Sequence, residues 1–178
     1  MSIKRIRVEI KGKSPLIMRA HPYIQEKPSE KQSPEEQAEE GTYRDPNTRE
    51  LFIPGINIHR CLINGGTYSK GKGRASLQKL VAASVMVENE HCWLGTKDYV
   101  IDGRWVVIQK GRVMRYRPRL NEWQTSFTII FDDNLLTENQ LRKVVDDSGD
   151  LIGLLEFRPE KKGPFGRFMV VEWKQVKA

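Results

Sequence analysis

The order of strand-like and helix-like segments is the feature that most narrows the fold of this chain. Residues 3–10 alternate charged and apolar side chains with the period of two that a half-buried strand requires. Phe127, Ile129 and Phe131, which alternate with Thr128 and Ile130, predict a second strand. Helices are predicted at 56–64 and 137–148, with a closing strand at 168–174. The order strand, helix, strands, helix, strand predicts an α+β fold of ferredoxin-like or RRM-like type: a split βαβ antiparallel sheet with helices on one face, plus insertions.

The middle of the chain is expected to contain shorter elements. A brief strand at 51–53 leads through Pro54-Gly55 into the first helix, and residues 77–87 resemble a helix at first and a strand toward their end. A hairpin is predicted with strands at 99–101 and 105–108 and a turn at Asp102-Gly103, before a basic strand at 112–117.

The length predicts a single domain over residues 1–178. Residues 19–50 are rich in proline and charge and are predicted to form an exposed insertion, in which Ser33-Pro34 begins a short helix. Residues 65–122 are predicted to form a second insertion that carries the basic hairpin.

Several functional classes are disfavoured. No apolar run approaches the length of a membrane span, and the N-terminus lacks the apolar centre of a signal peptide, so we predict a cytoplasmic protein with no membrane partner. Cys61 and Cys92 are expected to be buried free thiols. The three histidines show no metal-ligand spacing, and no P-loop or nucleophile motif occurs, which predicts no metal, no cofactor and no catalytic residue.

Positive charge is concentrated in two stretches. The net charge is +7, and the charged residues within 60–79 and 103–121 are all basic, whereas acids gather at 35–40 and 132–133. Segregation of this kind is typical of a face that binds a polyanion such as nucleic acid. Chance clustering on a solvated surface is the alternative.

The start of the first helix is one candidate binding site. A helix that begins after Pro-Gly exposes backbone N–H groups, and Gly55 would let a phosphate approach them. Asn57 and His59 offer hydrogen bonds, and Arg60 offers a charge. The alternative is an ordinary strand-to-helix turn.

Three further basic segments are candidates. In the loop 158–167, glycines would admit a nucleic-acid backbone and Phe165 would stack on bases, unless it packs in the core. Arginines two apart near 115–119 share one strand face, where they could bind phosphate or protect a sheet edge. The loop at 70–74 suits non-specific phosphate contacts. The candidate nucleic-acid-binding residues are Gly55, Asn57, His59, Arg60, Lys70, Lys72, Arg74, Arg115, Arg117, Arg119, Arg158, Lys161, Lys162, Phe165, Gly166 and Arg167.

Three ordered segments also resemble a known family. They are residues 10–18, in which Ser14-Pro15-Leu16 follows a strand, residues 51–60 (LFIPGINIHR), and residues 153–168 (GLLEFRPEKKGPFGRF). In order and spacing they resemble the RAMP superfamily, specifically the small backbone subunits of CRISPR effector complexes and related proteins of phages and other mobile elements. The resemblance implies a loop that faces RNA and a helical homo-oligomer on guide RNA (crRNA).

These features predict a non-catalytic protein that tracks the phosphate backbone of single-stranded RNA or DNA, with RNA preferred. It is expected to self-associate along the nucleic acid, to bind other effector subunits, or both, and the acidic segment 22–42 is expected to contact a basic face of a neighbouring copy. Two alternatives stay open. One is a metal-independent endoribonuclease that uses His59 or His21 with Tyr43 and a lysine. The other is a protein-binding mimic of such a subunit.

Overall fold

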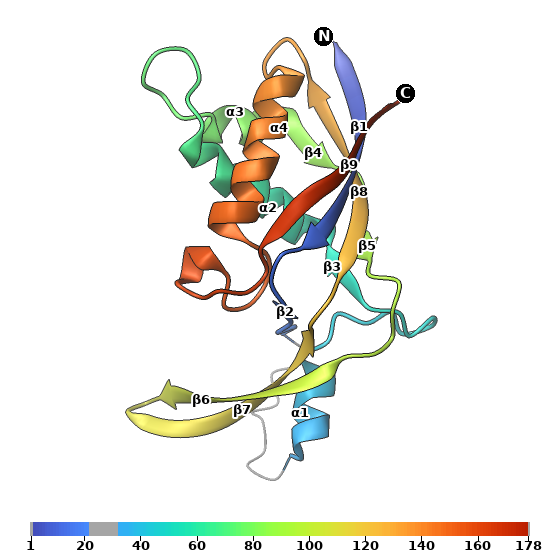
Figure 1. The fold of residues 1–178 in the computed structure, drawn as a ribbon, viewed down its shortest axis with the longest axis vertical. Helices are drawn as coiled ribbons and strands as arrows, with labels where there is room; N and C mark the ends of the chain where they lie inside the picture. The colour runs from blue at the N-terminus through green and yellow to red at the C-terminus, as the bar shows by residue number, and fades with distance from the viewer. Residues whose placement is uncertain (1, 22–31, 178) are drawn as a thin grey trace.

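A four-stranded antiparallel sheet, in the order β4-β8-β1-β9, forms the centre of the computed structural model, which describes residues 2–21 and 32–177. Helices α2 (Gly55–Gly65) and α4 (Glu138–Asp147) lie on one side of this sheet (Figure 1). The strands are β1 (Ile3–Gly12), β4 (Val85–Val87), β8 (Gln124–Asp132) and β9 (Phe168–Val176). Along the chain the order is β1, α2, β4, β8, α4, β9, so the predicted ferredoxin-like α+β fold is confirmed.

The alternation predicted for the central strands places their apolar side chains beneath the helices. Ile6 and Val8 of β1 are fully buried and pair across the sheet with Ile129 and Phe127 of β8. Their partners in α4 are Leu141, Val144 and Val145, which are also buried. Because successive side chains of a strand point to opposite faces, Arg5, Arg7 and Glu9 of β1 lie on the uncovered face, whereas Lys4 shares the face of Ile6 and pairs with Asp133 at 2.8 Å.

Local capping signals correctly located two helices. Thr137 and Gln140 form a reciprocal capping box at the start of α4, and Ser33 and Glu36 do the same for α1 (Pro34–Glu40). The ambiguous segment 77–87 contains both elements, α3 (Gln78–Ser84) and then β4. Cys61 and Cys92 are buried free thiols, as predicted.

The predicted turn at Asp102-Gly103 is wrong. Strand β6 (Val100–Ile108) continues through both residues, and its partner β7 (Gly111–Leu120) pairs with it along the whole length. The chain instead turns at Gln109-Lys110. Asp102 stays within the strand because its side chain forms ion pairs with Arg104 and Arg119. The Asp-Gly pair, which favours a turn in sequence, is therefore held in a strand by these ion pairs. The resulting hairpin extends away from the central sheet (Figure 1).

Smaller elements surround the base of this hairpin. Strand β2 (Leu16–Ile17) pairs with β7, and α1 packs against β7. A separate ribbon is formed by β3 (Phe52–Pro54) and β5 (His91–Trp93). The part of the predicted acidic segment at 22–31 lies outside the described residues. Of the helices described, none is both long enough and apolar enough to cross a membrane.

Candidate nucleic-acid interface

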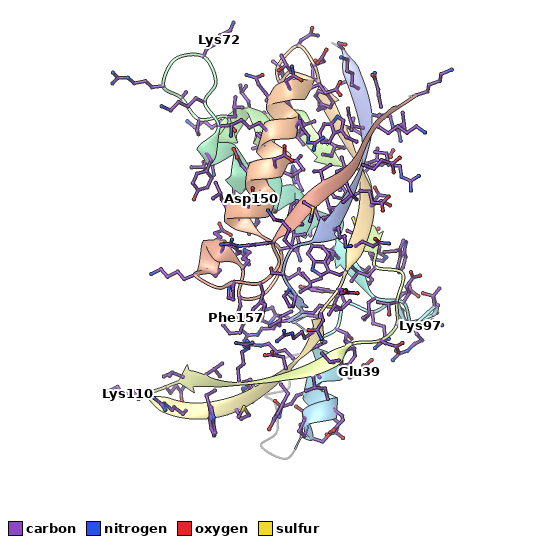
Figure 2. All side chains as sticks on the ribbon, viewed as in Figure 1. Glu39, Lys72, Lys97, Lys110, Asp150 and Phe157 are labelled. Carbon is purple, nitrogen blue, oxygen red and sulfur yellow. The ribbon has the colours of Figure 1, made fainter. Side chains whose placement is uncertain are left out.

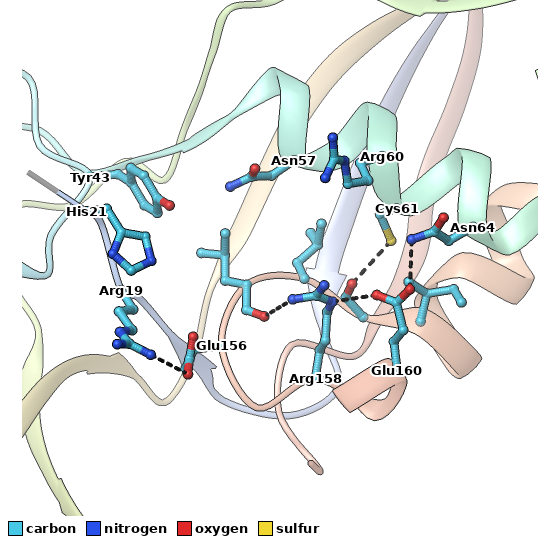
Figure 3. Close-up of a pocket in the computed structure, with 14 residues that line it drawn as sticks. Arg19, His21, Tyr43, Asn57, Arg60, Cys61, Asn64, Glu156, Arg158 and Glu160 are labelled. Carbon is cyan, nitrogen blue, oxygen red and sulfur yellow. Dashed lines mark hydrogen bonds and ion pairs between the residues drawn. The ribbon is translucent and has the colours of Figure 1, made fainter. Parts of the chain in front are cut away.

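A cavity of about 180 Å³ lies between α2 and the loop formed by residues 153–167 (Figure 3). Asn57, Arg60 and Asn64 of α2 line one wall. These residues share one side of the helix because positions three and four apart lie next to each other. The 153–167 loop supplies the opposite wall, which includes Glu156 and Arg158.

The end of the cavity is formed by residues from two other parts of the chain. Arg19 and His21 follow β2, and Tyr43 precedes β3. Figure 3 shows the three side chains in a column at one end of the cavity. The fold thereby brings together residues that are more than 100 positions apart in sequence, from Arg19 to Arg158.

Two polar residues of the loop wall are held in place by contacts within the protein. Arg158 donates a hydrogen bond from Nε to Glu160 at 2.8 Å and another from Nη1 to the carbonyl oxygen of Leu155 at 2.8 Å. Glu160 also accepts a hydrogen bond from the Asn64 amide at 2.8 Å. This network joins α2 to the loop and gives the cavity a defined shape.

Other side chains of the cavity have unused hydrogen-bonding capacity. Over the described residues, Asn57 and Arg60 form no side-chain hydrogen bond or ion pair with the protein. Three arginines line the cavity (Arg19, Arg60 and Arg158) against two glutamates (Glu156 and Glu160), which leaves an excess of positive charge. An anion that entered would therefore meet Arg60 without displacing an existing partner.

The 153–167 loop is fixed against the N-terminal segment. The Gly166 N–H donates to the carbonyl of Pro15 at 2.9 Å, and the Glu156 N–H donates to the carbonyl of Ile17 at 3.1 Å. Within the loop, the Leu154 N–H donates to the carbonyl of Gly166 at 2.9 Å. Two of the segments that resemble the known family, 10–18 and 153–168, are thus in direct contact.

A cluster of arginine and aromatic side chains joins this loop to the base of the hairpin. Arg119 lies 5.4 Å from the ring centre of Phe165, and Arg104 lies 4.7 Å from it on the same hairpin face. Arg117 lies 4.9 Å from the ring centre of Phe157. Because arginine is attracted to the faces of aromatic rings, these contacts hold the hairpin against the loop. Phe165 is only 7% exposed, which leaves its ring unavailable for stacking on a base.

Asp102 is the carboxylate of this cluster, and its side chain is only 8% exposed. Burial alone would raise its pKa, but hydrogen bonds from Arg104 and Arg119 outweigh that effect and hold the pKa below its ordinary value. The side chain of Arg117 is also largely buried, and burial lowers the pKa of its guanidinium.

Replacing Asp102 with asparagine is expected to lower the free energy of unfolding by about 1.5 kcal/mol at pH 7, because charge-assisted hydrogen bonds to two arginines are removed. Since the folded-state pKa is lowered, this stabilisation is present above the unfolded pKa of about 3.9 and is lost as the pH falls through the folded-state pKa. Denaturant titrations of both proteins over a pH series would measure it. A difference that persisted undiminished at acidic pH would contradict a role for the charge.

The predicted site residues fall into separate groups. Asn57, Arg60 and Arg158 line the cavity, and Lys161, Lys162 and Arg167 are exposed on the 153–167 loop. Arg115, Arg117 and Arg119 share one face of the hairpin with Arg104. Lys70, Lys72 and Arg74 lie on an exposed loop far from the hairpin (Figure 2).

Two predicted residues have structural contacts away from the cavity. The Gly55 N–H donates to the carbonyl of Glu90 at 2.8 Å, and a Cβ at Gly55 would lie 1.8 Å from the carbonyl oxygen of Asn89. This close packing explains the glycine, and the Gly55 N–H is already occupied by a protein carbonyl. His59 forms a hydrogen bond from Nε2 to the carbonyl of Val85 at 3.0 Å.

Sequence reasoning did not identify Arg19, Asn64 or Glu160 as residues of the site. Asn64 was detectable, because it lies seven positions after Asn57 on the same side of the helix. Arg19 carried no comparable signal, since only the tertiary structure places it beside α2. Among the residues described, no three His, Cys, Asp or Glu side chains are grouped closely enough to hold a metal ion.

No protein-family model matches the chain, and no curated protein matches it. Among solved structures, it is similar to the crystal structure of Cmr6 from Pyrococcus furiosus, with 10% sequence identity and a TM-score of 0.49 over 96% of this chain and 99% of that one. A similarity at this level carries no argument about function.

Proposed function

We propose that this protein binds single-stranded nucleic acid, with RNA preferred, and that the cavity between α2 and the 153–167 loop receives a phosphate of the backbone. The observation that carries the proposal is the pair Asn57 and Arg60, which line a positively charged cavity without partners among the described residues. At about 180 Å³ the cavity holds roughly six water volumes, which is room for a phosphate group. Charge-assisted hydrogen bonds from arginine suit that ligand.

The exposed basic residues would extend this interaction along the strand. Lys161, Lys162 and Arg167 belong to the same loop, and the net charge of +7 favours a polyanion in general. Contacts to phosphate alone make binding tolerant of sequence. The resemblance of three sequence segments to the small backbone subunits of CRISPR effector complexes supports the narrower proposal of a non-catalytic, guide-RNA-binding subunit that self-associates in the cytoplasm.

Fluorescence anisotropy with labelled single-stranded RNA, single-stranded DNA and duplex DNA of equal length tests the proposal. We expect the single strands to bind more tightly than the duplex, and the logarithm of the association constant to fall linearly with the logarithm of salt concentration. The ratio of RNA to DNA affinity would identify the natural ligand. Absence of binding at low salt would reject the proposal and favour the protein-binding mimic.

A second candidate is metal-independent cleavage of RNA. It is favoured by one observation: His21 and Tyr43, which could act as general acid and base, line the same cavity as Arg19 and Arg60. Incubation of labelled RNA in EDTA tests it, with His21→Ala as the active-site variant. His59→Ala is the matched control, because His59 contacts the carbonyl of Val85 instead. Cleavage that His21→Ala abolishes and His59→Ala preserves would establish this activity.

A further inference from the structure

The free end of the β6–β7 hairpin exposes apolar side chains to solvent. Trp105 is 66% exposed and Val107 72%, on the hairpin face that also carries Arg112, whereas Ile108 and Val113 are exposed on the opposite face. Two cations, Lys110 and Arg112, lie beside them, and in the described parts of the chain neither forms an ion pair. We call residues 105–113 the hairpin tip. Figure 2 shows Lys110 at its outer end. An apolar surface of this kind, bordered by cations, is typical of a contact with another macromolecule.

The tip is also built with an unfavourable turn. Gln109 and Lys110 have φ values of +48° and +67°, a left-handed conformation that glycine or asparagine adopts more easily in two-residue hairpins. Strain of this kind persists where the surrounding structure requires it. The turn therefore places a long cationic side chain, that of Lys110, at the outer end of the hairpin at some cost in backbone energy.

A groove on another part of the molecule is also apolar but is bordered by acids instead of cations. Its volume is about 540 Å³, and it lies between the start of α2, β4 and the β3–β5 ribbon. Ile56 is 66% exposed and Met86 59%, and the His91 ring stacks on Phe52 with 4.0 Å between ring centres. The acids at its rim are Glu88, which pairs with Arg5, and Glu90, which has no ion pair among the described residues.

We propose that the hairpin tip of one copy of this protein docks in this groove of a second copy. Trp105 and Val107 would cover the apolar surface of Ile56 and Met86, and Lys110 or Arg112 would lie beside Glu90. Of the described residues that line the groove, none is an arginine or lysine, and the tip contains no acid, so each surface fits the other better than it fits itself. This inference deepens the self-association included in the proposed function, because it names the two surfaces.

The positions of the two surfaces determine the kind of assembly. The hairpin tip and the β3–β5 ribbon lie on opposite sides of the view in Figure 1. In a reciprocal dimer each tip would have to reach the partner's groove at the same time, which two surfaces on opposite sides of the molecule disfavour, so a dimer retains one free tip and one free groove. Further copies can therefore add at either end, and the product is a chain of subunits rather than a closed dimer.

Sedimentation velocity of the protein without nucleic acid, over a concentration series, tests the proposal. The wild type is expected to form species larger than a dimer. Val107→Asp in the tip, or Ile56→Asp in the groove, should each reduce association at least tenfold, because each places a charge against the apolar surface. Circular dichroism of the variants would check that they fold; both sites are exposed, so no loss of fold is expected.

Mixing the two variants gives the sharpest test. Val107→Asp keeps an intact groove and Ile56→Asp keeps an intact tip, so the mixture should form a one-to-one heterodimer that grows no further. Glu90→Arg should also weaken association, and Arg112→Glu in the partner should restore it. Failure of the mixture to dimerise, or wild-type protein that stays monomeric throughout, would overturn the proposal. Anisotropy with RNA on the same variants separates this result from the proposed function, because neither surface lines the cavity at Arg60.

Discussion

Replacing Gly166 with alanine is expected to lower the free energy of unfolding by about 3 kcal/mol. Gly166 has a φ of +75°, a conformation that costs an L-amino acid roughly 1–2 kcal/mol. A Cβ there would also lie 2.0 Å from the carbonyl oxygen of Leu154, so the loop must shift at a further cost of about 1–3 kcal/mol. The shift would disturb the hydrogen bonds that connect Gly166 to Pro15 and Leu154.

Gly73 provides a matched control for this substitution. Its φ of +73° is nearly the same, but no atom lies within 4 Å of the position that a Cβ would occupy. Gly73→Ala should therefore lower the free energy of unfolding only by the cost of the left-handed backbone conformation, about 1 kcal/mol. Thermal unfolding would show the contrast, because each 1 kcal/mol lowers the Tm of a protein of this size by about 2–4 °C. Equal shifts for the two variants would contradict the crowding at Gly166.

The double variant Asn57→Ala, Arg60→Glu is expected to weaken binding to single-stranded RNA roughly 100-fold at low salt. Hydrogen bonds that involve a charged group contribute about 1.5–3 kcal/mol, and a tenfold change in affinity corresponds to about 1.4 kcal/mol. The slope of log affinity against log salt should also become shallower by about 0.7 for each phosphate that the variant no longer binds. Anisotropy over a salt series measures both quantities.

Lys97→Glu is the control for the charge change. It alters the net charge by the same amount as Arg60→Glu, but Lys97 is exposed and does not line the cavity (Figure 2). Its effect on affinity should be small at moderate salt, because distant exposed charges are screened there. If Lys97→Glu weakened binding as much as the double variant, the interaction would depend on net charge, and the cavity would have no special role.

Most of the fold could be predicted because its signals are local. The alternation that buries Ile6 and Val8 is visible within ten residues, and the capping box of Thr137 and Gln140 within four. The predicted turn at Asp102-Gly103 was wrong because the contacts that decide this region are not local. A dipeptide typical of turns remains in a strand because Arg104 and Arg119 form ion pairs with the Asp102 carboxylate, and Arg119 belongs to the neighbouring strand.

The candidate site was predictable only in part. Asn57, Arg60 and Arg158 were identified from charge and from their segments, but the sequence did not show that they face one cavity. It could not separate a basic residue without a partner in the described part of the chain, such as Arg60, from one that is engaged, such as Arg117 against Phe157.

The sequence by itself therefore determined the order of elements, the apolar face of each strand and the excess of positive charge, since each depends on neighbouring residues or on composition. The tertiary structure decided which arginines remain available, where the hairpin turns, and that Phe165 is covered. These outcomes depend on contacts between segments that are far apart in the chain, such as Pro15 with Gly166 and Arg19 with Glu156. Such contacts arise only when β1 takes its place between β8 and β9, which no local pattern encodes.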